Sequence, residues 1–186
     1  MTWTGRSTST KTCATANSKL GFLRRNIKTR DKALKEKAYQ TIVRPTLEYC
    51  STVWDPYTKT QAETIEKVQR RAARWVTGRY HNTSSVSNMI QDLGWRDLSQ
   101  RRVDTRLCML YKVSHGLVDI PIGQFLTFNR DGIHLLPIYA RTKYYEFSFF
   151  PRTVSAWNTL HINTLSAKSL NVFKANISKI IHSMPY

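Results

Sequence analysis

The sequence predicts a mainly α protein with two helical parts, and three observations support this prediction. Apolar residues recur at intervals of three and four over most of the chain, the period of one face of an α-helix. Capping residues and glycines stand where these periodic segments begin and end. Only residues 117–151 lack the period, and prolines and glycines punctuate them. We therefore expect a small helical bundle over residues 1–80 and a second helical lobe over residues 81–186, which contains an irregular aromatic segment.

Three helices are expected in the first part. The first covers residues 14–27, and the start before it is expected to be frayed or to belong to a unit whose remainder is missing. The second follows the N-cap Asp31 and breaks or kinks at Pro45. The third covers residues 61–77 and ends at Gly78. The residues expected on the apolar faces are Ala16, Leu20, Leu23 and Ile27, then Leu34, Ala38, Ile42 and Val43, then Ile65, Val68, Ala72 and Val76.

Four helices are expected in the second part. Their ranges are about 85–93, 97–115, 151–160 and 166–182. Ser85 or Ser87 opens the first of them and Asp97 caps the second, while Gly94 and Gly116 end these two. The segment without a helical period is expected to be loop with room for one short hairpin. The residues expected to face inward are Met89, Ile90 and Leu93, then Val103, Leu107, Leu110 and Tyr111, then Val154 and Trp157, then Leu170, Phe173, Ile177 and Ile180.

The chain carries a large excess of positive charge. It has 29 lysines and arginines against 12 aspartates and glutamates, and residues 1–80 alone hold 17 basic and 6 acidic side chains. Such an excess on a small surface predicts a polyanionic partner, nucleic acid before a membrane surface. No apolar run reaches the length of a membrane span, so we expect a soluble intracellular protein with no membrane partner. The three cysteines are expected to be packing residues.

The best organised part of this charge lies on the helix expected over residues 61–77. Lys67, Arg70, Arg71 and Arg74 recur at i, i+3, i+4 and i+7 and so form one line along the helix, which we call the basic stripe. Guanidinium groups can each bind two phosphate oxygens, so the basic stripe is predicted to contact a nucleic-acid backbone. Three further cations are expected to support it: Arg24, Arg25 and Lys28.

Other interpretations of these side chains stay open. The basic stripe could instead be a solvated face on which Glu63 and Glu66 neutralise part of the charge. Trp75, beside the basic stripe, belongs to the core or stacks on a base. A second, weaker basic patch is expected to have a structural role; it consists of Arg101, Arg102 and Arg106.

No catalytic or metal-binding motif is found in the sequence. There is no Asp-Asp or Asp-x-Asp pair for two-metal chemistry, and no phosphate-binding loop, nucleophile elbow or dinucleotide-binding motif. The five histidines have no spacing typical of metal ligands. We therefore expect no catalytic residue, no metal ion and no cofactor in this chain.

Short motifs follow one another in a fixed order along nearly the whole chain. They include Leu20-Gly-Phe-Leu-Arg-Arg-Asn26, Val43-Arg-Pro45, Leu47-Glu-Tyr49, Val53-Trp-Asp-Pro56, Glu66-Lys-Val-Gln-Arg-Arg-Ala-Ala-Arg74, Leu93-Gly-Trp95, Ser148-Phe-Phe-Pro-Arg152 and Trp157-Asn158. Each motif alone is weak, but the combination is specific. It resembles the end of the reverse transcriptase of jockey-like non-LTR retrotransposons, an RNA-directed DNA polymerase.

The resemblance implies a position within a polymerase rather than an activity of this chain. Residues 1–80 would be similar to the thumb, which grips the primer-template duplex, and residues 81–186 to the segment that follows it. The family's metal-binding aspartates have no counterpart here. We therefore expect a truncated fragment without fingers and palm that is not an enzyme alone. It would bind nucleic acid without sequence preference, have the missing palm as a further partner, and be nuclear if the parent element acts there.

Two alternatives remain at this stage. A free-standing DNA-binding module would use the helix over residues 61–77 to read bases, with Gln69 as its one amide reader. A decayed reading frame would yield no folded product, because Leu20, Leu23 and Tyr39 would be exposed without a palm to cover them and would promote aggregation.

Overall fold

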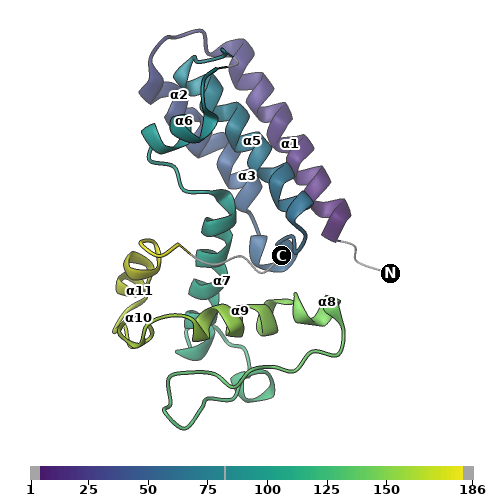
Figure 1. Ribbon diagram of the computed structural model, residues 1–186, viewed down its shortest axis with the longest axis vertical. Helices are drawn as coiled ribbons and strands as arrows, with labels where there is room; N and C mark the ends of the chain where they lie inside the picture. The colour runs from purple at the N-terminus through teal and green to yellow at the C-terminus, as the bar shows by residue number, and fades with distance from the viewer. Residues whose placement is uncertain (1–4, 82, 182–186) are drawn as a thin grey trace. The chain divides into compact units, whose positions relative to one another are not determined.

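A computed structural model describes residues 5–81 and 83–181 of the chain (Figure 1). The described part is mainly helical, which confirms the predicted fold class. It divides into two compact units between Ser99 and Gln100, here called the N-terminal unit and the C-terminal unit. Each unit has its own cluster of buried apolar side chains, so each is organised around a separate core.

The N-terminal unit opens with helix α1 (Gly5–Asn26). The frayed start expected before residue 14 is wrong for residues 5–13, and residues 1–4 lie outside the described residues. Cys13 and Ser9 lie about one and two turns before Ala16 on the same face, and both are buried. Packing along this face therefore extends the helix through a serine- and threonine-rich stretch whose intrinsic helix propensity is low.

Pro45 does not break the second helical segment. The chain runs through α2 (Lys32–Ala38), a π-helical turn η1 (Tyr39–Val43), α3 (Arg44–Glu48) and the short α4 (Ser51–Trp54). A proline lacks an amide hydrogen and its ring crowds the carbonyl four residues earlier, and the wider π turn just before it relieves both problems. The predicted break is thus replaced by a widened turn.

The widened turn changes which side chains face the core. Tyr39, Val43 and Leu47 are fully buried, one at every fourth position, whereas Leu34 and Ile42 are exposed. The predicted apolar face of this helix is therefore only partly right. The predicted N-cap is confirmed, because the carboxylate of Asp31 accepts the amide hydrogens of Ala33 and Leu34.

Helices α5 (Lys59–Thr77) and α6 (Val86–Asp92) follow the sequence closely. Gly78 ends α5 with a left-handed φ of 68°, and the hydroxyl of Ser85 caps α6 by accepting the amide of Asn88. The four residues predicted for the apolar face of α5 are all buried, namely Ile65, Val68, Ala72 and Val76.

The N-terminal unit extends beyond residue 80, where the sequence placed the end of the first part. The ring of Trp95 stacks on Tyr39 at a centroid distance of 4.6 Å. The indole nitrogen of Trp95 donates to Glu36 Oε1 at 2.7 Å. These contacts join residues 81–99 to the bundle, so the division comes later in the chain than expected.

The bundle encloses the side chains whose exposure was expected in an isolated fragment. Leu20 and Leu23 are 2% and 3% exposed, and Tyr39 is fully buried. They pack within the N-terminal unit itself, among the residues of its core. The expectation that they form exposed apolar surface is therefore wrong.

The C-terminal unit contains most of α7 (Leu98–Ser114) and an irregular segment after it. The four residues of α7 predicted to face inward are buried: Val103, Leu107, Leu110 and Tyr111. The irregular segment holds a 3-10 turn η2 (Ile122–Gln124) and the short helix α8 (Lys143–Glu146). A single antiparallel bridge between Phe128 and Leu135 stands where a short hairpin was expected.

Three helices complete the C-terminal unit: α9 (Phe149–Asn158), α10 (Ile162–Leu165) and α11 (Leu170–Ile177). The helix expected over about 166–182 is present as α11 but is shorter than expected among the described residues; residue 182 lies outside them. The hydroxyl of Ser169 accepts the amide of Val172 and so starts a new helix. The expected inward positions Phe173 and Ile177 are buried.

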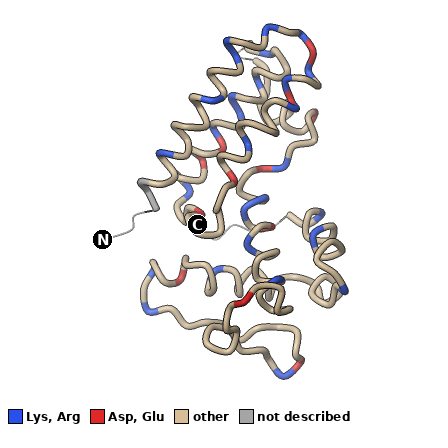
Figure 2. The backbone as a smooth tube through the Cα atoms, turned by 180° about the vertical axis from the view of Figure 1, so that it is seen from behind, with Lys and Arg blue, Asp and Glu red and all other residues tan. Residues whose placement is uncertain are grey.

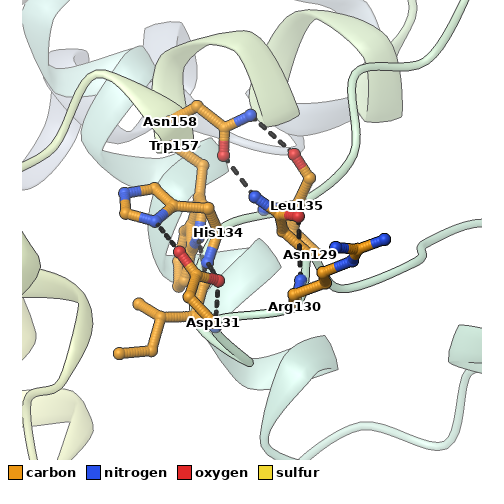
Figure 3. A network of polar contacts seen from close by, with 8 residues as sticks. Asn129, Arg130, Asp131, His134, Leu135, Trp157 and Asn158 are labelled. Atoms are coloured by element: carbon orange, nitrogen blue, oxygen red, sulfur yellow. Dashed lines mark hydrogen bonds and ion pairs between the residues drawn. The ribbon is translucent and has the colours of Figure 1, made fainter.

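Two neighbouring side chains of α9 hold the irregular segment in place (Figure 3). The amide of Asn158 donates to the carbonyl of Leu135 at 2.7 Å and accepts from its backbone N–H at 3.1 Å. The indole nitrogen of Trp157 donates to the carbonyl of Ile133 at 3.2 Å. The Trp157-Asn158 motif thus satisfies backbone groups of a loop that has almost no partner strand of its own.

The turn that these residues hold contains an acidic group with a lowered pKa. The backbone amide of Ile133 and the side chain of His134 donate to the carboxylate of Asp131 and lower its pKa to about 2. The charged form is favoured in the folded turn, so its stabilising contribution is full above pH 3.8, the ordinary value, and is lost as the pH falls through about 2. An NMR titration of the Asp131 carboxyl carbon should give a midpoint near 2; a midpoint near 3.8 would contradict the hydrogen bonds drawn in Figure 3.

Candidate nucleic-acid interface

Helix α5 places the basic stripe on the outside of the N-terminal unit. Its apolar face packs into the core, so the cations at the intervening positions face away from it. Lys67, Arg70, Arg71 and Arg74 are all exposed. The structure therefore brings the four predicted residues together on one accessible face of a helix.

Most of this charge is not neutralised within the described part of the chain. Lys67, Arg70 and Arg74 have neither a hydrogen bond nor an ion pair there. Arg71 donates to the side-chain oxygen of Asn17 at 2.9 Å, which is a neutral partner. The basic stripe thus keeps its full positive charge, which favours an anionic partner outside the described residues.

Glu63 and Glu66, the two acidic residues that could neutralise the basic stripe, form no ion pair with it among the described residues. Oε1 of Glu66 accepts the backbone amide of Ser99 at 2.7 Å, near the start of α7. Glu63 is exposed and, in the described ranges, makes no ion pair with any of the four cations. The pairing with Glu63 and Glu66 that the alternative interpretation required is therefore absent among the described residues, while the cations themselves are solvated.

Helices α1 and α5 run in the same direction, side by side (Figure 1). Lys19 of α1 donates to Thr46 of α3 at 2.8 Å, and Tyr39 donates to Gln69 of α5 at 3.1 Å. Because α1 leads by a short loop into the segment over residues 32–48, that segment runs antiparallel to both long helices.

This arrangement places one of the supporting cations beside the basic stripe. Arg24 lies seven residues after Asn17, about two helical turns, so it is on the side of α1 that meets Arg71. Arg74 is one turn after Arg71 in the same direction. The side chain of Arg24 is exposed and continues the positive surface from α5 onto α1. Figure 2 shows basic positions recurring along both helices.

Arg25 and Lys28, the other two predicted supporting residues, are not aligned with the basic stripe. Arg25 follows Arg24 and is therefore turned away by about 100° around the helix. Lys28 lies beyond Asn26, where α1 ends. Both are exposed, so they add positive potential near the basic stripe without being aligned with it.

Two residues beside the basic stripe belong to the core rather than to a binding surface. Trp75 is 5% exposed, with Lys35 Nζ 5.9 Å from its ring centroid, so it is not free to stack on a base. Gln69 is 1% exposed, accepts from the hydroxyl of Tyr39 and donates to the carbonyl of Arg96 at 3.0 Å. The amide reader required by a sequence-specific module is thus committed to the core.

Two of the three arginines of the second basic patch are buried, as a structural role requires, whereas Arg101 is half-buried. Arg102 and Arg106 are each 2% exposed, and both lie on α7 in the C-terminal unit. Arg152 of α9 is also buried, with its guanidinium carbon 5.9 Å from the ring centroid of Phe147. Sequence reasoning missed Arg152, since a single arginine after a proline carries no signal of burial.

The described residues contain no cluster of three or more histidine, cysteine, aspartate or glutamate side chains that could hold a metal ion. Instead, His161 caps α10 by accepting the amide of Asn163, and His115 stacks on Tyr111.

Of the three cysteines, Cys13 is buried, whereas Cys50 is exposed at a left-handed φ of 50°. The prediction that all three cysteines are packing residues is therefore wrong for Cys50. Burial raises the pKa of Cys108.

The chain was compared with protein families, curated proteins and solved structures. No protein-family model, no curated protein and no solved structure matches the chain. Among the described residues, no helix is both long enough and apolar enough to cross a membrane.

Proposed function

We propose that this chain corresponds to the thumb and the segment after it of a jockey-like non-LTR retrotransposon reverse transcriptase, and that it binds the nucleic-acid backbone without sequence preference. The order of short motifs from Leu20 to Asn158 supports the family. The observation that carries the binding is the basic stripe, exposed along α5 with three of its cations lacking any partner in the described structure. The preferred ligand is a primer-template duplex.

The proposal assigns no catalytic step to this chain. A polymerase needs carboxylates that converge on paired metal ions, and the sequence has no Asp-Asp or Asp-x-Asp pair. Polymerase activity would belong to a chain that also carried a palm. The buried position of Gln69 speaks against the free-standing base-reading module.

Changing Arg70, Arg71 and Arg74 together to glutamine is expected to weaken duplex binding to all sequences alike. If the four cations of the basic stripe neutralise about four phosphates, the logarithm of the affinity should fall against the logarithm of the salt concentration with a slope of roughly −3 to −4. Each lost contact should bring that slope about one unit closer to zero. Fluorescence anisotropy with duplexes of unrelated sequence, over a series of salt concentrations, measures both effects.

A matched control variant removes three positive charges from the C-terminal unit instead of from the basic stripe. Lys168, Lys174 and Lys179 are exposed in the C-terminal unit, and their change to glutamine should leave the salt slope nearly unchanged. All six positions are exposed, so none of the changes should unfold the protein, and circular dichroism checks this. Equal losses in the two triple variants would show that net charge, not the basic stripe, carries binding and would reject the proposal.

A further inference from the structure

One segment of the C-terminal unit exposes an unusual set of side chains. Tyr139, Tyr144 and Tyr145 are 85%, 80% and 49% exposed, and Arg141 and Lys143 between them are exposed as well. We call residues 139–145 the tyrosine segment. Tyrosine is more often largely covered in a folded protein, because its ring is large and apolar. Two largely exposed rings and a half-exposed one within seven residues therefore form an accessible aromatic surface.

The tyrosine segment carries two basic side chains, Arg141 and Lys143, of which Lys143 pairs with an acidic residue. Arg141 has neither a hydrogen bond nor an ion pair among the described residues. Lys143 is held by Glu146, with Nζ 2.9 Å from Oε2, and lies 5.9 Å from the ring centroid of Phe147. Glu146 is the one acidic residue between residues 132 and 181. An anionic partner is thus favoured on this surface too.

An anchored turn before the tyrosine segment and a helix cap within it hold the segment in place. Before it, the turn over residues 127–136 is held to α9 by Trp157 and Asn158 (Figure 3). Within it, the hydroxyl of Thr142 accepts the amide of Tyr145 and caps α8. Ordered flanks reduce the conformational entropy lost when these rings take up a ligand.

The surface is also hollowed beside the tyrosine segment. The residues that line a cavity of about 390 Å³ include Pro137, Ile138, Phe147 and Arg152. A second cavity, of about 430 Å³, shares Pro137, Ile138 and Glu146 with it and reaches Tyr139. A ligand that contacts the ring of Tyr139 therefore has a hollow with both apolar and charged lining beside it.

We propose that the tyrosine segment binds single-stranded nucleic acid, with bases stacked on Tyr139 and Tyr144 and phosphates bound by Arg141 and Lys143. Alternating aromatic and basic side chains suit this ligand, because every unpaired base offers a flat face and every linkage a negative charge. A duplex is a poor ligand here, since its bases already stack on one another. This proposal goes beyond the duplex binding proposed above, because it concerns another unit and another form of nucleic acid.

The test compares binding of labelled oligo(dT), which forms no duplex, to the full chain and its variants by fluorescence anisotropy. Stacking on one ring contributes at least about a fivefold gain in affinity, so changing Tyr139 and Tyr144 together to alanine should weaken binding about 25-fold or more. Changing both to phenylalanine keeps the rings and should cost little. Tyr49, 77% exposed in the N-terminal unit, provides a matched control, and Tyr49→Ala should bind oligo(dT) as the unchanged chain does.

Three results would overturn the proposal. The double alanine variant could bind oligo(dT) as tightly as the unchanged chain. The double phenylalanine variant could lose as much as the alanine variant, which would exclude stacking as the cause. The double alanine variant could lose binding to vesicles of anionic lipid while keeping oligo(dT), which would assign the surface to a membrane. Duplex binding through the basic stripe is measured separately, so either proposal can fail without the other.

Discussion

Replacing Tyr39 with alanine is expected to lower the free energy of unfolding of the N-terminal unit by about 3–5 kcal/mol. Tyr39 is fully buried, its ring stacks on Trp95, and its hydroxyl donates to Gln69. Removing the ring leaves a cavity at the centre of the bundle. It also leaves a buried acceptor of Gln69 without its donor, which adds to the cost because that group stays out of water.

Urea unfolding followed by circular dichroism measures this change. Tyr39→Phe separates its two causes, since it keeps the ring and should cost about 1–3 kcal/mol for the unsatisfied acceptor. Tyr80→Ala is the matched control, because Tyr80 is 56% exposed in the same unit and its removal should stay within about 0.5 kcal/mol. If Tyr39→Ala were no more destabilising than Tyr80→Ala, Tyr39 could not be the centre of this core.

The basic stripe could be predicted from the sequence because α5 is strongly amphipathic. Apolar and basic side chains alternate with one helical period over its whole length, and a capping glycine marks its end. Ile65 and Val76 are buried where that period places them, and Arg70 and Arg74 are exposed. A helix of this kind depends on local pattern alone, so one sequence is sufficient to locate both its packing face and its charged face.

Other features depend on contacts between distant residues and could not be predicted. Around the π turn before Pro45, Val43 is buried as predicted, but Tyr39 is buried in addition while Leu34 and Ile42 are exposed, and nothing in a helical wheel shows a widened turn. Glu66 looked like a partner for nearby cations, but it accepts the amide of Ser99, 33 residues later. Which side chains are buried and which partner a carboxylate takes therefore depend on tertiary packing, and the spacing of residues along one helix does not show either.

The tyrosine segment was visible in the sequence only as part of an irregular stretch. The sequence carried no expectation for its tyrosines beyond a loop with room for one short hairpin. The structure builds the core of the C-terminal unit from other residues, including Leu107, Trp157 and Phe173, and leaves the tyrosines of this segment outside it. Alternation of tyrosine with arginine and lysine over residues 139–145 is the signal that could have indicated a binding surface.

Replacing Trp157 with alanine is expected to lower the free energy of unfolding of the C-terminal unit by about 3–5 kcal/mol. Trp157 is 2% exposed, lies 5.6 Å from Phe173 between ring centroids, and holds the irregular segment through the carbonyl of Ile133. Its loss removes a large part of the second core and frees one anchor of the turn before the tyrosine segment. Trp157→Phe should cost less, since it keeps much of the apolar contact and loses the hydrogen bond.

Hydrogen exchange followed by mass spectrometry locates the effect. Because Trp157 belongs to the core of the C-terminal unit, protection in Trp157→Ala should fall in α9, α11 and the turn over residues 127–136. Oligo(dT) binding should weaken with it, because the turn positions the rings that are proposed to stack on bases. Unchanged protection of that turn would contradict the anchoring role of Trp157, and tight oligo(dT) binding with an unprotected turn would show that the rings need no fixed support.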